Sequence, residues 1–188
     1  MKIEIRQIND KEIVHLSGYI NAVGRESKLL SDTINGQFVE IVEPGVFKNS
    51  LEKHPDIPML LNHNPQAEIA RNGQNLHLKE DSIGLRFDAD IENEEVIKLA
   101  KDNQLVGCSF GFVDIKSKRE PKNGKINKRT LQEINLQEVS ILSAGHMPAY
   151  YGTLVEAREN DNKPKEIRYV DNDPLYREKL LLVIKTYL

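Results

Sequence analysis

The sequence predicts an α+β protein that is mainly β, built as an open or closed β-barrel with short helices at its periphery. Two observations lead to this fold class. Most of residues 1–157 consist of short runs in which apolar and polar residues alternate, which is typical of strands that bury one face. Only two short segments of that region have the spacing and capping residues of helices. Many short strands with few helices favour a barrel or an open sheet with helices around it.

The expected strands follow one another along the first part of the chain. The clearest covers residues 85–91, where Leu85 and Phe87 alternate with charged residues. The strands are expected at residues 2–8, 12–23, 37–43, 57–62, 76–78, 85–91, 107–115, 130–131 and 137–142. Asn123 and Gly124 lie between two of these strands and predict the tip of a long hairpin.

Two helices are expected among these strands, at residues 44–53 and 93–101. The second begins at Asn93, whose side chain can cap the first turn. Acidic residues follow in its first turn and lysines occupy its last turn, an arrangement that complements the helix dipole.

The composition changes after residue 158, which predicts three parts. Residues 1–158 form one folded domain, and residues 159–172 read as a polar linker. Asp173 followed by Pro174 is typical of a helix start, so residues 173–188 are expected to form an amphipathic helix. Its apolar face could dock on the core, or it could bind a partner or a second copy of the chain.

The composition is that of a soluble globular protein, because hydrophobic residues make up 39% and charged residues 29% of the chain. The formal net charge of -3 provides no overall positive field for nucleic acid. Cys108 is the only cysteine, which excludes an intramolecular disulfide and suits a reducing compartment. The sequence shows no signal peptide, membrane span, metal motif or nucleotide motif. We therefore expect no metal, cofactor, nucleic acid or membrane partner.

A serine in the expected strand 107–112 is the first candidate for chemistry. Cys108 and Phe110 point to one face of this strand, and Ser109 and Gly111 point to the other. The aromatic face belongs in the core, so the Ser109 hydroxyl points away from it, and Gly111 leaves room beside it. Taken alone, this is more often an ordinary strand serine beside a packing glycine. Serine becomes a nucleophile only beside a base such as histidine.

His63 and Glu138 are the candidates that could activate this serine. His63 closes the apolar run 57–62, and catalytic groups often lie at such strand ends. Glu138 lies in an apolar strand, where a carboxylate needs a partner such as a histidine N–H. His63 could instead be a histidine that caps a turn, and Glu138 could lie on an exposed strand face. His146 stays a candidate because it is near Glu138 in the sequence. A Cys108 peptidase is disfavoured because the thiol shares the aromatic face.

Several segments in the same order resemble those of the tailed-phage prohead proteases, which are serine endopeptidases distantly similar to herpesvirus assemblins. The resemblance covers residues 15–158. It rests on Gly18-Tyr19, Phe38-Val39-Glu40, Pro44-Gly45-Val46-Phe47, Leu60-Leu61-Asn62-His63, Gly107-Cys108-Ser109-Phe110-Gly111-Phe112, Glu138-Val139-Ser140-Ile141-Leu142 and Met147-Pro148-Ala149-Tyr150-Tyr151-Gly152-Thr153, followed by Val155 and Arg158. It implies an assemblin-like β-barrel surrounded by helices.

The resemblance also implies a set of site residues. Ser109 matches the nucleophile, His63 matches the general base, and Glu138 matches the third member that orients the histidine. His146 and Glu133 are the alternatives for that third position, because herpesvirus relatives use a second histidine there.

We also expect backbone N–H groups to bind the oxyanion, and we look for them among small residues that allow close approach. Gly111 and the loop residues Ala144 and Gly145 are the candidates for this role or for substrate contact.

The resemblance further implies a place of action and partners. The enzyme would work in the host cytoplasm inside the immature capsid, the prohead. It would cleave the scaffold or the scaffold-like extension of the major capsid protein, and often itself. A homo-oligomer is compatible with the apolar C-terminal segment. The competing interpretation is a non-enzymatic assembly protein on the same fold, which binds capsid or scaffold through the linker and the terminal helix.

Overall fold

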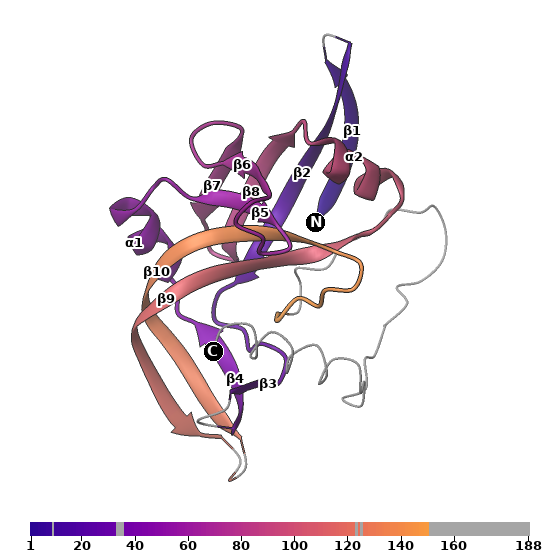
Figure 1. Cartoon of the computed structure of the whole chain (residues 1–188). Coiled ribbons are helices and arrows are strands. Elements are labelled where there is room, and N and C mark those ends of the chain that lie inside the picture. Colours follow the sequence, from indigo (N-terminus) through magenta and orange to yellow (C-terminus); the bar gives the residue numbers. More distant parts are fainter. Residues whose placement is uncertain (9, 33–35, 123, 125, 151–188) are drawn as a thin grey trace. The chain divides into compact units, whose positions relative to one another are not determined.

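The computed structural model describes residues 1–150 apart from residues 9, 33–35, 123 and 125, and this region is mainly β with two short helices (Figure 1). The helices are α1 (Val46–Lys53) and α2 (Glu94–Lys101). The strands are β1 (Lys2–Ile8), β2 (Lys11–Ala22), β3 (Leu30–Asp32), β4 (Gly36–Val42), β5 (Pro58–Leu61), β6 (Glu68–Arg71), β7 (Leu76–Glu80), β8 (Gly84–Ile91), β9 (Leu105–Pro121) and β10 (Asn127–Ser143).

Hydrogen bonds arrange the described strands in two sheets. The first has the order β1-β2-β8-β7, and all its neighbours are antiparallel. The second has the order β3-β4-β10-β5-β6, with β9 paired to β10. The mainly β class with two short helices is confirmed, whereas the closed barrel stays a prediction.

Strand β10 organises the second sheet. It pairs antiparallel with β9 along its whole length, so the two form a long curved ribbon (Figure 1). The first part of β10 pairs in parallel with β4, and a later part pairs in parallel with β5. Helix α1 connects β4 to β5 and contacts β10. This crossover brings the end of β5 next to the last third of β10.

The core lies between the apolar faces of the sheets and the two helices. Phe110 of β9 meets Phe47 of α1 edge to face, with ring centroids 5.1 Å apart. Cys108 and Phe110 are buried, while Ser109 and Gly111 are partly exposed. The predicted alternation of β9 is therefore confirmed, and Ser109 lies on the face away from the aromatic core.

Most expected elements are present, but the strands expected at residues 130–131 and 137–142 are parts of one strand, β10, and the strand expected at 107–115 extends to Pro121 as β9. Both helices form, and the N-cap prediction for Asn93 is confirmed by its side chain, which accepts a hydrogen bond from the Val96 N–H at 3.1 Å. The long hairpin is formed by β9 and β10, although Asn123 at its tip lies outside the described residues. The short strands β3 and β6 were not expected. The predicted linker 159–172 and helix 173–188 lie outside the described residues.

Candidate active site

His63 lies where the chain leaves β5, in a turn that β10 holds in place. Leu61 still pairs with Ile141 of β10, but Asn62 and His63 both have left-handed backbones, with φ of 57° and 59°. Two consecutive residues of this kind are unusual outside glycine, and asparagine tolerates the conformation best. The Asn62 side chain accepts from the Ser143 N–H at 2.8 Å and donates to the Ser143 hydroxyl at 2.9 Å. These bonds stabilise the turn that presents His63.

Glu138 lies beside a β-bulge in β10. The pairing of β10 with β9 shifts between Leu136 and Glu138, so Gln137 is the extra residue. Bulges bend a strand and redirect the side chains next to them. The Leu136 N–H donates to the Ser50 hydroxyl of α1 at 2.9 Å, which ties the helix to β10 at this point. The bulge and this contact fix the position from which Glu138 projects.

The imidazole of His63 and the carboxylate of Glu138 are joined by a hydrogen bond. His63 Nδ1 lies 2.6 Å from Glu138 Oε1. The Glu138 side chain is 13% exposed and that of His63 is 42% exposed, so the pair lies at the edge of the fold with the carboxylate inside. An ionised carboxylate can only accept, so the proton belongs on Nδ1. In the neutral ring this leaves Nε2 as a proton acceptor.

Ser109 is placed next to this pair by strand register. It lies directly opposite Ser140, and Gly111 lies directly opposite Glu138. Side chains of directly opposed residues share a face of an antiparallel pair. Ser109 therefore shares a face with Glu138, and β10 lies between β9 and the end of β5. Among the described residues, the Ser109 hydroxyl makes no hydrogen bond, so its proton is available to a base.

Gly111 provides the space that the carboxylate occupies. A Cβ atom at this position would lie 2.6 Å from Oε1 of Glu138 and 3.2 Å from its Cγ. The prediction that Gly111 leaves room beside Ser109 is thus explained by the side chain that fills that room. A side chain at this position would therefore require the Glu138 carboxylate to shift from its place against His63.

Comparison with known proteins places the chain in a family. The family model of the caudovirus prohead serine proteases matches residues 1–166, which include all three candidates. The chain belongs to this family. A prohead serine protease is a hydrolase of phage capsid maturation that acts within the procapsid, and its family substrates are capsid proteins. A comparison with curated proteins finds no match.

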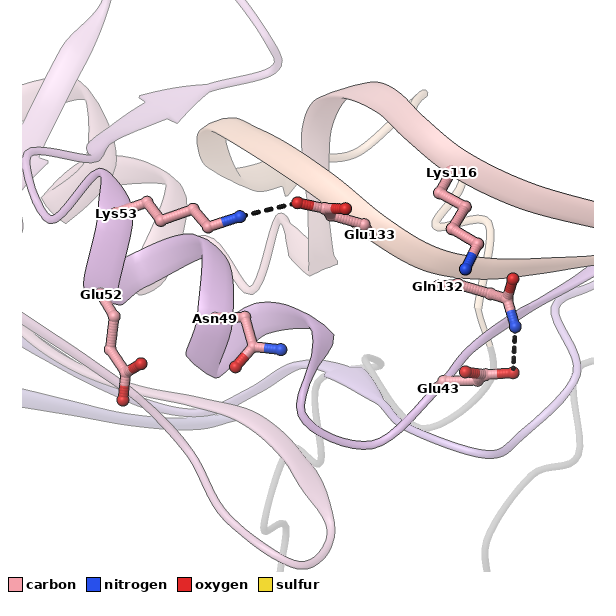
Figure 2. A pocket seen from close by; sticks show the side chains of 7 residues that line it. All are labelled: Glu43, Asn49, Glu52, Lys53, Lys116, Gln132 and Glu133. Atoms are coloured by element: carbon pink, nitrogen blue, oxygen red, sulfur yellow. Dashed lines mark hydrogen bonds and ion pairs between the residues drawn. The ribbon is translucent and has the colours of Figure 1, made fainter.

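Neither alternative for the third position forms a hydrogen bond with the His63 side chain among the described residues. Glu133 is bound to Lys53 of α1 at 2.7 Å, in a polar hollow shown in Figure 2. The hydrogen bond from Lys53 is the main reason that the pKa of Glu133 is lowered. His146 is exposed in the loop after β10. Of the three, Glu138 is the residue whose side chain is hydrogen-bonded to His63.

Of the two oxyanion donors expected in the loop after β10, Ala144 and Gly145, the first already donates its N–H to another group. The Ala144 N–H donates to the Gln104 carbonyl at 2.7 Å, so it is not available to bind an oxyanion. The chain then reaches Tyr150, whose ring stacks on Phe110 with centroids 5.8 Å apart. This is the face opposite to Ser109. An oxyanion role for Gly145 or Gly111 stays a prediction.

Cys108 is shielded from solvent and from the site. Its side chain is buried on the Phe110 face, and its Sγ lies 3.7 Å from the Met1 sulfur. Burial raises the pKa of the Cys108 thiol to about 12. A thiol that stays protonated and inaccessible is a poor nucleophile, which argues against a cysteine peptidase.

Sequence reasoning missed the groups that hold the pair in place. Asn62, Ser140 and Ser143 form hydrogen bonds around His63 and Glu138. Ser140 shares the strand face of Glu138 in the sequence pattern, which was the one available signal.

Two features are absent from the residues that the structure describes. No helix there is long and apolar enough to cross a membrane, and no group of three or more His, Cys, Asp or Glu side chains is placed to hold a metal ion.

Proposed function

We propose that this chain is a serine endopeptidase of prohead maturation that uses Ser109 as nucleophile, His63 as general base and Glu138 as the group that orients the histidine. The observation that carries the proposal is the 2.6 Å contact between His63 Nδ1 and Glu138 Oε1. Glu138 of β10 and Ser109 of β9 share one face of the paired strands. Family membership supports the chemistry and its site in the procapsid.

The first half of the reaction forms an acyl-enzyme. His63 Nε2 takes the proton of the Ser109 hydroxyl as its oxygen attacks the carbonyl carbon of the scissile peptide bond. The charged imidazolium that results lies against the Glu138 carboxylate, which stabilises it. When the tetrahedral intermediate collapses, His63 returns the proton to the leaving amine, and the C–N bond breaks.

The second half regenerates the enzyme. His63 takes a proton from a water molecule, the resulting hydroxide attacks the acyl carbon, and the bond to Ser109 breaks as the serine recovers its proton. Glu138 keeps its charge throughout and holds the ring with Nε2 toward the reacting atoms. No metal or cofactor takes part in this sequence.

The substrates we propose are the scaffold or the scaffold-like extension of the major capsid protein, and the protease itself. The role of the family in capsid maturation supports this choice. Residues 1–158 would act as the protease domain, followed by the linker 159–172 and the helix 173–188. Cleavage within the last two parts would be one form of self-processing.

The test is co-expression of the full chain with the capsid protein of the same phage. Mass spectrometry of both proteins records cleavage, and circular dichroism records folding. The parent chain should cut, and Ser109→Ala should be folded but inactive. Ser117→Ala is the matched control, because Ser117 lies on the same strand and bonds to Asp114 away from the site. Unchanged cleavage by Ser109→Ala would refute the proposal, and stable capsid binding without any cleavage would favour an assembly protein.

A further inference from the structure

We propose that Ser140 is a positioning residue of this site, whose single hydroxyl holds the Glu138 carboxylate and the His63 backbone in register. The inference rests on the proposed function and extends it to a fourth residue. The Ser140 hydroxyl lies 2.6 Å from Glu138 Oε2, and the His63 N–H lies 3.2 Å from the same Ser140 oxygen. The Ser140 side chain thus connects His63 and Glu138 through a second path, separate from the bond between their own side chains.

The direction of each hydrogen bond follows from chemistry. A backbone N–H can only donate, so the Ser140 oxygen accepts from His63. An ionised carboxylate can only accept, so the one Ser140 proton goes to Glu138 Oε2. Each oxygen of the carboxylate therefore has its own donor, the His63 ring on Oε1 and Ser140 on Oε2. With both oxygens engaged, the carboxylate plane cannot rotate freely.

Ser140 is suited to holding other groups and unsuited to attack. Its side chain is fully buried at 0% exposure, while Ser109 directly opposite is partly exposed. Its proton is donated to Glu138, and no hydrogen bond joins its hydroxyl to the His63 ring among the described residues. The two opposed serines therefore have different roles, Ser109 toward the substrate and Ser140 toward the histidine and the carboxylate.

The consequence is a fixed tautomer of the histidine. Glu138 places the imidazole proton on Nδ1 only while its Oε1 stays aimed at that nitrogen. Without Ser140, Oε2 and the His63 N–H both lose a partner in a buried place, and the carboxylate and the turn can move apart. The ring would then populate the form with its proton on Nε2, which cannot accept the proton of Ser109.

The experiment measures the tautomer and the kinetics separately. Nitrogen-15 NMR of the His63 ring is recorded on the full-length Ser109→Ala chain, which cannot digest itself, with and without Ser140→Ala. Val139→Ala is the matched control, because Val139 is the buried neighbour whose side chain points to the opposite face. Cleavage kinetics are measured on the same Ser140 and Val139 variants with Ser109 intact.

We expect Ser140→Ala to mix the two tautomers and to lower kcat on the order of 10- to 100-fold at similar KM, the size of effect that small misplacements cause. Val139→Ala should keep the proton on Nδ1. Ser140→Cys nearly conserves volume but donates poorly, so it should behave like Ser140→Ala, and it replaces that variant if alanine prevents folding.

A Ser140 variant that folds, keeps the Nδ1 proton and keeps the parental kcat would overturn the inference, as would a Ser140→Cys variant that behaves as the parent. Failure of the proposed function is a different result, absence of cleavage by the parent chain. In that case the tautomer measurement still decides whether Ser140 positions the pair.

Discussion

The two sides of the candidate site are built by different means. On the side of β5 and β10, side-chain hydrogen bonds connect His63, Glu138 and Ser140 and fix the turn after β5. On the side of β9, no side-chain hydrogen bond holds Ser109 among the described residues, and its position comes from backbone pairing opposite Ser140.

This difference matches the chemistry that we propose for each side. A base and its orienting carboxylate must keep one geometry through both halves of the reaction. Side-chain hydrogen bonds can hold them in that geometry. A nucleophile must release its proton and turn toward a substrate, so a hydroxyl with no bound partner is suited to it. Changes on the two sides should therefore lower kcat by different amounts.

The largest effect on the hydrogen-bonded side is expected from Glu138→Gln. The amide has nearly the same shape but no charge, and it can leave the wrong tautomer on His63. We expect kcat to fall on the order of 10⁴-fold, as neutralising the acid of a serine-protease triad does, while KM changes little. Steady-state cleavage of a capsid-derived peptide measures both constants. Glu133→Gln, on the same strand but bound to Lys53, should retain the parental kcat. Equal losses in the two variants would contradict the assignment of Glu138.

A smaller effect is expected from Gly111→Ala, which acts from the β9 side. The new methyl group would meet Glu138 Oε1 at 2.6 Å and displace the carboxylate from His63. We expect kcat to fall about 100-fold, because small displacements in an active site have effects of this size. In a Glu138→Ala background the same change should cost little, since the displaced group is absent. Purely additive losses in this double-mutant cycle would show that Gly111 acts by another route.

The smallest effect on catalysis is expected at Cys108, on the core face of β9. Iodoacetamide should leave the native thiol unmodified and cleavage unchanged, because the side chain is buried. Loss of cleavage on alkylation of the native protein would revive a cysteine mechanism.

The same residue gives a stability prediction with a defined sign. Burial raises the pKa of Cys108 from 9.0 to about 12 in the folded chain. The folded state therefore holds this proton more tightly, and its contribution to stability is present below pH 9.0 and lost as the pH rises toward about 12. Urea unfolding across this range should show a steeper decline for the parent than for Cys108→Ala. If the free energy of unfolding falls equally with pH in the two proteins, the raised pKa of Cys108 is contradicted.

Much of β9 could be predicted from the sequence because its alternation is regular. Phe110 and Cys108 define the core face, and Ser109 and Gly111 fall on the other face without any knowledge of the fold. The short strands β3 and β6 were missed because three or four residues are too few to show a period.

Strand alternation alone could not separate Glu138 from Glu133 as the proposed third member, because β10 is irregular. Its pairing shifts on both sides of Glu133 and again before Glu138, so strict alternation does not assign faces along the whole strand. The left-handed turn at Asn62 and His63 depends on Ser143, which lies 81 residues beyond Asn62 in the chain. Contacts of that kind arise only when β5 and β10 pair.

The role of Ser109 as nucleophile is tested most directly by labelling with a fluorophosphonate probe in the co-expressed mixture that cleaves the capsid protein. Mass spectrometry then identifies the labelled peptide. We expect the probe to modify Ser109, labelling to stop cleavage, and His63→Ala to abolish labelling. Label on Ser140, or cleavage that continues with Ser109 unmodified, would contradict it.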